Sequence, residues 1–390
     1  MASYEELKHN KKGLPGIKIT VEHGYDEETG ERIRFFKTVR MKNLSDRAIK
    51  KAITDFEIEV ANKEKTEKLE NITFAQFVER WMDNYVKIDL SVRTRNDYKY
   101  HLDGGILDEL KDRKLASIKT FHLVECINKW KENSSHMALQ KYVVLKSIFA
   151  TAVEWKVLKE NPMKGAKRPR TEKRHKELEF YDECQLGRLF EVLEHVNRKH
   201  KMQIKLTVLT GLRMGELGGI RTECIDFEKN IILINKSLQF DKETKKLVLG
   251  PTKNKKARIV DVPDKFMKEL KSFVEEQDMM RDDMGSAWNP MKDDNGEPIN
   301  FLFIRDDGYP QHPKSAAVAW DRIMEKYKLP KISFHSLRHS YASYALSKGV
   351  NFKIIQEQLG HSDIKLTIGT YSHLTERDKA NASNLFNDLL

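Results

Sequence analysis

Apolar and polar residues alternate in two short runs near the N-terminus, GIKITVEHGY and ERIRFFKTVR, which are separated by the turn sequence DEETG. Alternation with a period of two on both sides of a turn is typical of antiparallel strands. Ser45 then has the character of a helix N-cap, and apolar residues recur at helical spacing from Ala48 to Val60. The pattern predicts a domain over residues 1–62 in which a small three-stranded sheet is covered by one helix.

The chain changes from strand-like to helical patterns after this domain. The charged segment 62–71 has the composition of a linker or a frayed helix end, and apolar residues from Thr73 onward fall on one helical stripe. Further helical patterns, broken by a Gly-Gly pair and by the sequence NSS, cover residues 91–102, 117–130 and 135–157. We therefore predict a helical bundle over residues 72–160.

The remaining sequence consists of a basic linker and a large C-terminal region. Residues 161–176, NPMKGAKRPRTEKRHK, contain two prolines, a glycine and seven Lys or Arg residues, a composition that favours an interdomain linker. From Asp182 onward the pattern is mainly helical, interrupted by the strand-like runs NIILINKSLQF, KKLVLGP and ARIVDVP. We predict a mainly α domain over residues 177–390 with one small antiparallel sheet, and a multidomain α+β fold for the whole chain.

Length and composition narrow the class of protein. A chain of 390 residues is longer than one hydrophobic core usually supports, so two or three domains are expected. No apolar run approaches the roughly 18 residues of a membrane span, and the polar N-terminus lacks the apolar core of a signal peptide. Cys126, Cys184 and Cys224 fit neither a disulfide framework nor a zinc site. The expected protein is cytoplasmic, does not interact with membranes and holds no metal.

The charge balance points to a polyanionic partner. Lys and Arg number 70 against 59 Asp and Glu, which gives a net charge of +11, and a basic surface of this kind suits a phosphate backbone. A solvated basic surface without specific binding is the alternative. The candidate DNA contacts are Arg34 and Lys37 in the N-terminal sheet, Arg93, Arg95, Lys99, Lys141 and Lys146 at exposed positions of the bundle, and Arg168 and Arg170 in the linker.

Two stretches of the C-terminal region contain an arginine or a lysine next to glycines or in a predicted turn between strands. In TGLRMGE, Gly211 and Gly215 allow close backbone approach beside Arg213, and Glu216 lies on the same helical side as the arginine and can hold it. Taken alone, this stretch also fits an ordinary structural Arg-Glu pair. In PTKNKKAR, which joins two strand-like runs, Lys253 is expected near a hairpin tip, with Lys255 and Lys256 as rivals for the same role.

Two further stretches add histidines, a second arginine and a tyrosine. FHSLRHSYAS places His335 and Arg338 three residues apart on a helix, so that both point to one side. LGHSDIKLTIGTYSHL contains His361 and, beyond a turn, Tyr371. Any one of these residues has an ordinary structural explanation, since a lone tyrosine in such a place is usually part of the packing.

The four stretches, taken in this order, resemble the tyrosine recombinase family, also called the lambda-type phage integrases. The resemblance is specific over about residues 180–376, moderate over residues 72–160 and weak over the N-terminal sheet, which looks like an arm-site DNA-binding domain. Gly369 departs from the family pattern because a larger residue is expected before the tyrosine. The resemblance implies that the catalytic residues are Arg213, Lys253, His335, Arg338, His361 and Tyr371, with Glu216 in support.

The resemblance also implies a reaction. The arginines would stabilise the phosphate, the histidines would hydrogen-bond or accept a proton, and Lys253 would protonate the leaving 5′ oxygen. Tyr371 would form a 3′-phosphotyrosyl intermediate with neither cofactor nor ATP. The chain contains no GxxxxGK[ST] loop and no HExxH spacing, which agrees with this expectation.

The partners implied by the resemblance are double-stranded DNA attachment sites, three further copies of the chain in a homo-tetramer, an excisionase or other directionality factor, and a host DNA-bending protein. The substrate would be a phage or another mobile element. A C-terminal apolar stripe, Ala380, Leu385, Phe386 and Leu389, can pack on its own domain or on a neighbouring copy. A type IB topoisomerase and a non-catalytic DNA-binding regulator remain the alternative functions.

Overall fold

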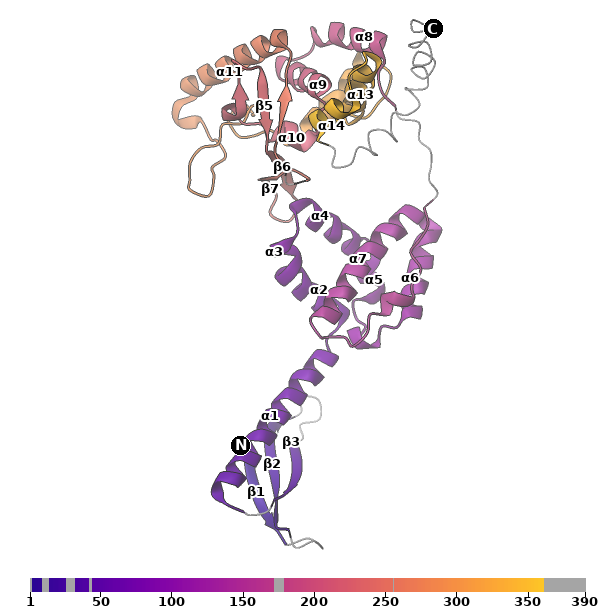
Figure 1. Cartoon of the computed structure of the whole chain (residues 1–390), viewed down its shortest axis with the longest axis vertical. Helices are drawn as coiled ribbons and strands as arrows, with labels where there is room; N and C mark the ends of the chain where they lie inside the picture. Colours follow the sequence, from indigo (N-terminus) through magenta and orange to yellow (C-terminus); the bar gives the residue numbers. More distant parts are fainter. Residues whose placement is uncertain are drawn as a thin grey trace, which may run out of the picture. The chain divides into compact units, whose positions relative to one another are not determined.

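The computed structural model describes residues 2–8, 14–25, 32–41, 44–171, 179–254 and 256–360 (Figure 1). The chain forms two compact units, of which the first contains residues 1–90 and 97–172 and the second contains residues 91–96 and 173–390. The first unit comprises the N-terminal sheet and the helical bundle apart from residues 91–96, and the second comprises the C-terminal region together with residues 91–96. Of the helices in the described part of the chain, none is both long and apolar enough to cross a lipid bilayer.

The N-terminal part of the first unit is a three-stranded antiparallel sheet in the order β1-β2-β3, with one helix packed on it. Its elements are β1 (Ala2–Leu7), β2 (Gly16–Tyr25), β3 (Arg32–Arg40) and α1 (Asp46–Glu70). Ile17, Ile19 and Val21 alternate along β2 toward the helix, where they pack with Phe56 and Val60. The predicted sheet and helix are confirmed, and the strand that the apolar pattern did not locate is β1, whose sequence ASYEEL is largely polar.

The rest of the first unit is the predicted helical bundle. Its elements are α2 (Phe74–Trp81), the π-helical turn η1 (Met82–Val86), α3 (Lys87–Asp89), α4 (Val92–His101), the π-helical turn η2 (Leu102–Ile106), α5 (Leu107–Leu110), η3 (Leu115–Ser117), α6 (Thr120–Asn133), α7 (Ser135–Glu154) and η4 (Pro162–Gly165). Thr73 caps α2 in a capping box with Gln76, and Ser134 caps α7. The core contains the buried aromatic side chains of Phe74 and Trp81.

The prediction of a linker over residues 161–176 was wrong for the first residues of that segment, because they belong to the bundle. Met163 and Ala166 are buried in the bundle core. The Thr120 hydroxyl donates a hydrogen bond to the carbonyl oxygen of Pro162 at 2.8 Å, and the Tyr142 hydroxyl donates one to the carbonyl oxygen of Ala166 at 3.3 Å. A proline-rich sequence therefore packs here through a short 3-10 turn and through its carbonyl groups.

The second unit contains two small sheets, one of which shares a core with the surrounding helices. Its elements are α8 (Glu183–Leu193), α9 (Arg198–Thr210), α10 (Met214–Gly218), η5 (Thr222–Cys224), β4 (Ile225–Asp226), β5 (Ile231–Ile234), β6 (Lys236–Asp241), β7 (Lys246–Pro251), β8 (Arg258–Asp261), α11 (Asp264–Met284), η6 (Gly285–Ala287), α12 (Ser315–Lys326), α13 (Ser336–Ser347) and α14 (Phe352–Leu359). One core joins α9, the β4-β5-β8 sheet, α11 and α12 through buried residues such as Leu206, Ile232, Leu270 and Trp320. Helix α9 also packs against α13, which positions the ends of both helices.

The predicted mainly helical C-terminal region with antiparallel strands is confirmed, but the strands form two sheets, β4-β5-β8 and β6-β7, instead of the one expected. The run NIILINKSLQF divides at Asn235, whose side-chain oxygen accepts a hydrogen bond from Arg221 at 3.1 Å. Strands β5 and β6 are separated only by Asn235, whereas their pairing partners, β8 and β7, are separated by the segment 252–257. One continuous ladder therefore cannot form. Lys253 lies, as predicted, in the connection between the two strands β7 and β8, but these strands pair with β6 and β5 and not with each other, so the connection is not a hairpin.

Candidate active site

The first arginine of the site is positioned by the end of α9. The helix stops at Gly211, which adopts a left-handed backbone conformation with φ of 67°, and Arg213 then begins α10. A Cβ atom on residue 211 would lie 2.4 Å from Cδ2 of Leu359 and 3.0 Å from Cδ1 of Tyr341. Only glycine fits both the conformation and the space, so the TGLR sequence allows α9, α13 and α14 to meet beside Arg213.

Glu216 holds Arg213 through two contacts. Arg213 Nη1 donates to Glu216 Oε1 at 2.7 Å, and the backbone N–H of Arg213 donates to Oε2 at 3.1 Å. The same carboxylate accepts two bonds from Arg258, Nη1 to Oε1 at 3.1 Å and Nη2 to Oε2 at 2.7 Å. Burial alone would raise the pKa of Glu216, but the hydrogen bonds and charges of Arg258 and then Arg213 outweigh it and lower the pKa to about 2. Glu216 is therefore ionised at neutral pH, although only 2% of it is exposed.

The second arginine of the site is Arg338 on α13. It is almost fully buried, and it donates hydrogen bonds to the carbonyl oxygens of Gly211 at 2.6 Å and Leu359 at 2.8 Å. Arg213 Nη2 in turn donates to the carbonyl oxygen of Gly360 at 3.1 Å. Both arginines are thus anchored to the same helix end, that of α14, where carbonyl groups lack helical partners and carry partial negative charge.

His335 and Lys253 belong to the same group of side chains. Desolvation first, and then the positive charges of Arg338, Arg213 and Lys253, lower the pKa of His335, so its imidazole is neutral at pH 7. Lys253 is exposed, and the next residue anchors its loop, because Asn254 Nδ2 donates to the carbonyl oxygen of Gly360 at 3.2 Å. A neutral imidazole can accept a proton, and an exposed ammonium group can reach a ligand.

Four of the six predicted catalytic residues therefore come together, from three separate segments of the second unit: Arg213, Lys253, and the pair His335 and Arg338. His361 and Tyr371 lie outside the described residues, as does Lys255, the rival of Lys253. Their assignments stay predictions. The last described residue is Gly360, which precedes His361 and already contacts Arg213.

Arg258 is a residue of this site that the sequence reasoning missed. Its side chain is 11% exposed, and it pairs with Glu216 from the start of β8. A signal was present in the sequence, because an arginine that begins an apolar strand is unusual. No local pattern indicates its partner, Glu216, which lies 42 positions earlier in the chain.

The predicted DNA contacts in the bundle and its C-terminal extension differ in exposure. The exposed ones are Arg93, Lys99, Lys146, Arg168 and Arg170. Lys141 was wrongly predicted to be exposed, because its side chain is buried beside Trp130, with Nζ 4.7 Å from the centre of the indole, and burial lowers its pKa. Arg95 is half-buried and belongs to the second unit, in which it pairs with Asp241 at 3.4 Å.

The two predicted DNA contacts of the N-terminal sheet lie on opposite faces. Arg34 is on the face opposite α1 and forms an exposed ion pair with Glu22 at 3.1 Å. Lys37 faces α1 instead, where it pairs with Glu59 and lies 5.6 Å from the centre of the Phe56 ring. Lys37 therefore contacts the helix that packs on the sheet, while its side chain stays 42% exposed, and its assignment as a DNA contact stays a prediction.

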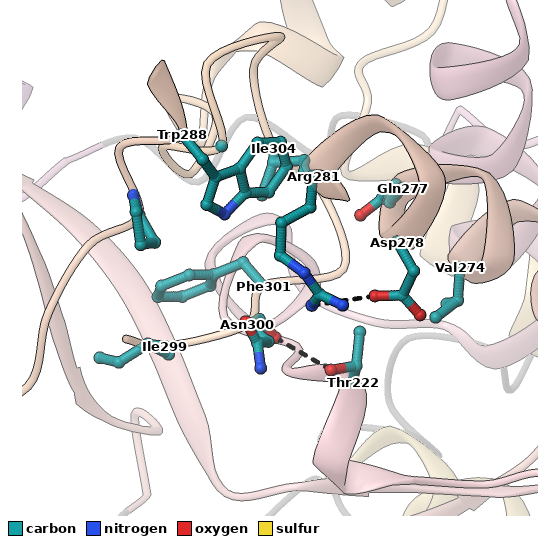
Figure 2. Close-up of a pocket in the computed structure, with 12 residues that line it drawn as sticks. Thr222, Val274, Gln277, Asp278, Arg281, Trp288, Ile299, Asn300, Phe301 and Ile304 are labelled. Atoms are coloured by element: carbon teal, nitrogen blue, oxygen red, sulfur yellow. Dashed lines mark hydrogen bonds and ion pairs between the residues drawn. The ribbon is translucent and has the colours of Figure 1, made fainter. Parts of the chain in front are cut away.

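Two pockets beside the end of α11, of about 20 and 520 Å³, are lined by none of the candidate catalytic residues. Figure 2 shows a pocket beside Trp288, Arg281 and Asn300, formed by the end of α11 and the segment that follows it. Its volume of about 20 Å³ holds roughly one water molecule, and none of the candidate catalytic residues lines it. Within the described residues, no three His, Cys, Asp or Glu side chains are grouped so that they could hold a metal ion.

Comparison with known proteins agrees with this arrangement. The family model described as the phage integrase family matches residues 179–378, which is more than half of the chain, and the phage integrase N-terminal SAM-like domain matches residues 73–131. A tyrosine recombinase XerC-like protein of Caldanaerobacter subterraneus subsp. tengcongensis is 26% identical over 337 residues, or 82% of this chain and 84% of that protein. The ICEBs1 integrase of Bacillus subtilis is 24% identical and covers 96% of this chain and 97% of its own length.

Solved structures show the same fold. The Tn1549 transposon integrase in complex with transposon right end DNA has a TM-score of 0.63 at 21% identity, and the match covers 80% of this chain and 98% of that chain. A lambda integrase dimer bound to a core site has a TM-score of 0.53 at 16% identity, with 93% of each chain covered. The family match favours a recombinase over a type IB topoisomerase or a non-catalytic regulator. The chain is therefore a member of the phage integrase family and a site-specific recombinase of the tyrosine type.

Proposed function

We propose that this recombinase cleaves DNA by attack of the Tyr371 hydroxyl on a phosphodiester, forms a 3′-phosphotyrosyl intermediate and rejoins the strand to a different 5′ end. The observation that carries the proposal is the convergence of Arg213, Arg338, His335 and Lys253 at the end of α14, from which the chain leads directly to His361. The tyrosine follows ten residues after that histidine.

The two arginines would stabilise the negative charge of the phosphate in the reaction. A phosphodiester repels nucleophiles because it is negatively charged, and its pentacoordinate transition state places further charge on the non-bridging oxygens. Guanidinium groups present donors in a planar fork that matches two phosphate oxygens, and they act more strongly in a site from which water is excluded. Arg338 is almost fully buried and Arg213 partly so, which favours this role.

His335 and Lys253 suit the proton transfers. As the Tyr371 oxygen forms its bond to phosphorus, its proton passes to a histidine, and the neutral state of His335 makes it a competent acceptor beside His361. The bond from phosphorus to the 5′ oxygen breaks at the same time, and Lys253 supplies the proton to that leaving oxygen. Because the phosphotyrosyl bond keeps the energy of the phosphodiester, the reverse attack by a 5′-hydroxyl needs neither ATP nor a metal ion.

We further propose that the substrates are double-stranded attachment sites of a phage or another integrative element, in the cytoplasm of a bacterial host. The fold neighbours include integrases bound to DNA and a lambda integrase tetramer bound to a Holliday junction, with a TM-score of 0.52. A homo-tetramer on DNA, a directionality factor and a host DNA-bending protein belong to the same proposal. The exposed Arg34, Arg93, Lys99, Lys146, Arg168 and Arg170 are the candidate phosphate contacts.

A covalent-adduct assay tests the chemistry. The protein is incubated with a nicked suicide substrate that contains a DNA site it binds, then denatured, and the mixture is examined for protein that migrates with DNA. We expect an adduct on the 3′ side of the cleaved strand with wild-type protein, in the presence of EDTA and without ATP, and none with Tyr371→Phe. An adduct that survives in Tyr371→Phe, or that needs a metal ion, would contradict the proposal.

A further inference from the structure

Arg258, the first residue of β8, links the carboxylate of Glu216 to the C-terminal end of α14. Its three side-chain nitrogens all donate: Nη1 and Nη2 to the carboxylate of Glu216, and Nε to the carbonyl oxygen of Gln358 at 2.9 Å. Its side chain is only 11% exposed. An arginine whose donors are all directed into protein is built to hold other groups in place.

The first group that Arg258 holds is the carboxylate that orients Arg213. Each Glu216 oxygen accepts one bond from Arg213 and one from Arg258, so the carboxylate is fixed on both sides. With Arg258 removed, Glu216 could rotate about its terminal bond, and the Arg213 guanidinium would rotate with it. Arg258 also supplies the second positive charge, so one carboxylate between two guanidinium groups leaves a net charge of +1 toward a phosphate.

The second group that Arg258 holds is the C-terminal end of α14. Besides the bond from Nε to Gln358, the side chain of Gln358 makes two bonds to the backbone of Asp261 in β8, at 3.1 and 3.3 Å. Gly360 has a left-handed φ of 66°, and a Cβ atom there would lie 2.9 Å from both Cδ and Nη1 of Arg258. The glycine thus packs directly on the arginine, one residue before His361.

We propose that Arg258 is a positioning residue of the recombinase. It fixes Arg213 through Glu216, and it fixes the end of α14 from which His361 and the segment of Tyr371 depart. This inference rests on the proposed function, because it assigns Arg258 to the cleavage step and not to DNA binding. Arg258 acts through these neighbours and is not proposed to touch the phosphate.

The test compares Arg258→Lys and Arg258→Gln with matched changes at Arg221, in the full-length protein. Arg221 is also a largely buried arginine of the second unit, with a side chain 18% exposed and an ion pair to Glu223 at 2.7 Å, but it contacts none of the catalytic candidates through the bonds described above. Three quantities are measured for each variant. They are the DNA affinity in a gel shift, the rate of single-turnover cleavage of the suicide substrate at saturating protein, and the melting temperature.

We expect Arg258→Lys to bind DNA nearly as tightly as wild type and to cleave about 10²-fold more slowly, because an ammonium group cannot bridge both Glu216 oxygens and Gln358. The Arg221 variants should cleave at close to the wild-type rate, even where they lower the melting temperature as much as the Arg258 variants do. In a Glu216→Gln background the effect of Arg258→Lys on the rate should largely disappear, since both changes release Arg213.

Several outcomes would overturn the assignment. Arg258→Lys could cleave at the wild-type rate, or the Arg221 variants could lose as much cleavage for the same loss of melting temperature. Additive effects of Arg258→Lys and Glu216→Gln would show that Arg258 does not act through the carboxylate. The lysine variant keeps the test decisive if Arg258→Gln does not fold. An absence of any adduct with wild-type protein at a site that it binds would instead refute the proposed function, and this inference with it.

Discussion

Replacing Glu216 by glutamine removes one charge from the centre of the site without changing its shape. In the wild-type protein the two carboxylate oxygens accept four hydrogen bonds, from the side chains of Arg213 and Arg258 and from the backbone of Arg213. A glutamine retains one acceptor oxygen and turns an NH₂ group toward two other donors. The substitution therefore loses at least two bonds and leaves two guanidinium groups close together without a compensating charge.

The pKa of Glu216 gives the magnitude. A fall from the ordinary 4.5 to about 2 corresponds to about 3 kcal/mol in favour of the ionised form in the folded protein, at about 1.4 kcal/mol per pKa unit. Loss of one partner from a buried ion pair costs about 3–5 kcal/mol, which agrees. Because the pKa is lowered on folding, this stabilisation is complete above the pKa of the unfolded chain, near 4.5, and is lost as the pH falls toward 2.

The assay is urea unfolding of wild type and Glu216→Gln over a series of pH values, followed by tryptophan fluorescence. We expect the variant to be about 3 kcal/mol less stable at pH 7 and at pH 5, and the difference to shrink as the pH falls below about 4.5. Glu194→Gln is the control, because Glu194 also has two cationic partners, Lys201 and Lys205, but its side chain is 55% exposed. Its loss should stay below about 1 kcal/mol. A difference for Glu216→Gln that is as small as that of the control, or that does not change with pH, would refute the reasoning.

Two further predictions use matched pairs of residues. Gly211→Ala should destabilise the protein by about 2 kcal/mol or more in thermal unfolding, because of the left-handed backbone and the contact with Leu359. Gly187→Ala, in open space within α8, should instead stabilise it by about 0.5–1 kcal/mol. Equal effects of the two substitutions would contradict the packing argument. Arg34→Ala should weaken DNA binding in gel shifts, and the slope of log affinity against log salt concentration should fall by about 1, whereas Lys37→Ala should change neither. A comparable loss of affinity in both variants would show that the face of the sheet does not decide which side chain contacts DNA.

The sequence predicted those parts of the fold that local patterns decide. The apolar stripe that begins at Phe74 and the alternation along β2 both face a core, so the pattern and the burial agree. β1 could not be located in this way, because its polar residues take part mainly through backbone pairing with β2. The division into two C-terminal sheets depends on the segment 252–257 facing the single residue Asn235 across the ladder, and no local pattern contains that information.

The surroundings of Lys141, whose exposure was wrongly predicted, and of Lys37 had a signal in the sequence. Lys141 lies three positions after Ala138 and four before Leu145, which are both buried, so helical spacing places it on the core side of α7. Lys37 alternates with Phe35 and Val39, which pack toward α1. In both cases the charge of the side chain was given more weight than its position, although a lysine can bury its aliphatic stem along apolar surface.

The site itself was predictable as a set of residue types, but the way it is held together was not. Neutral acceptors orient an arginine without removing its charge, and this is how Gly211 and Leu359 hold Arg338. Arg213 is held by a carboxylate, which would cancel its charge if Arg258 did not share it. Both arrangements keep positive charge available for a phosphate while they fix its direction, and both depend on helix ends and strand positions far apart in the sequence. The family motif therefore names the side chains that we propose to react, whereas the contacts of Arg258 account for how Glu216 and the end of α14 are held.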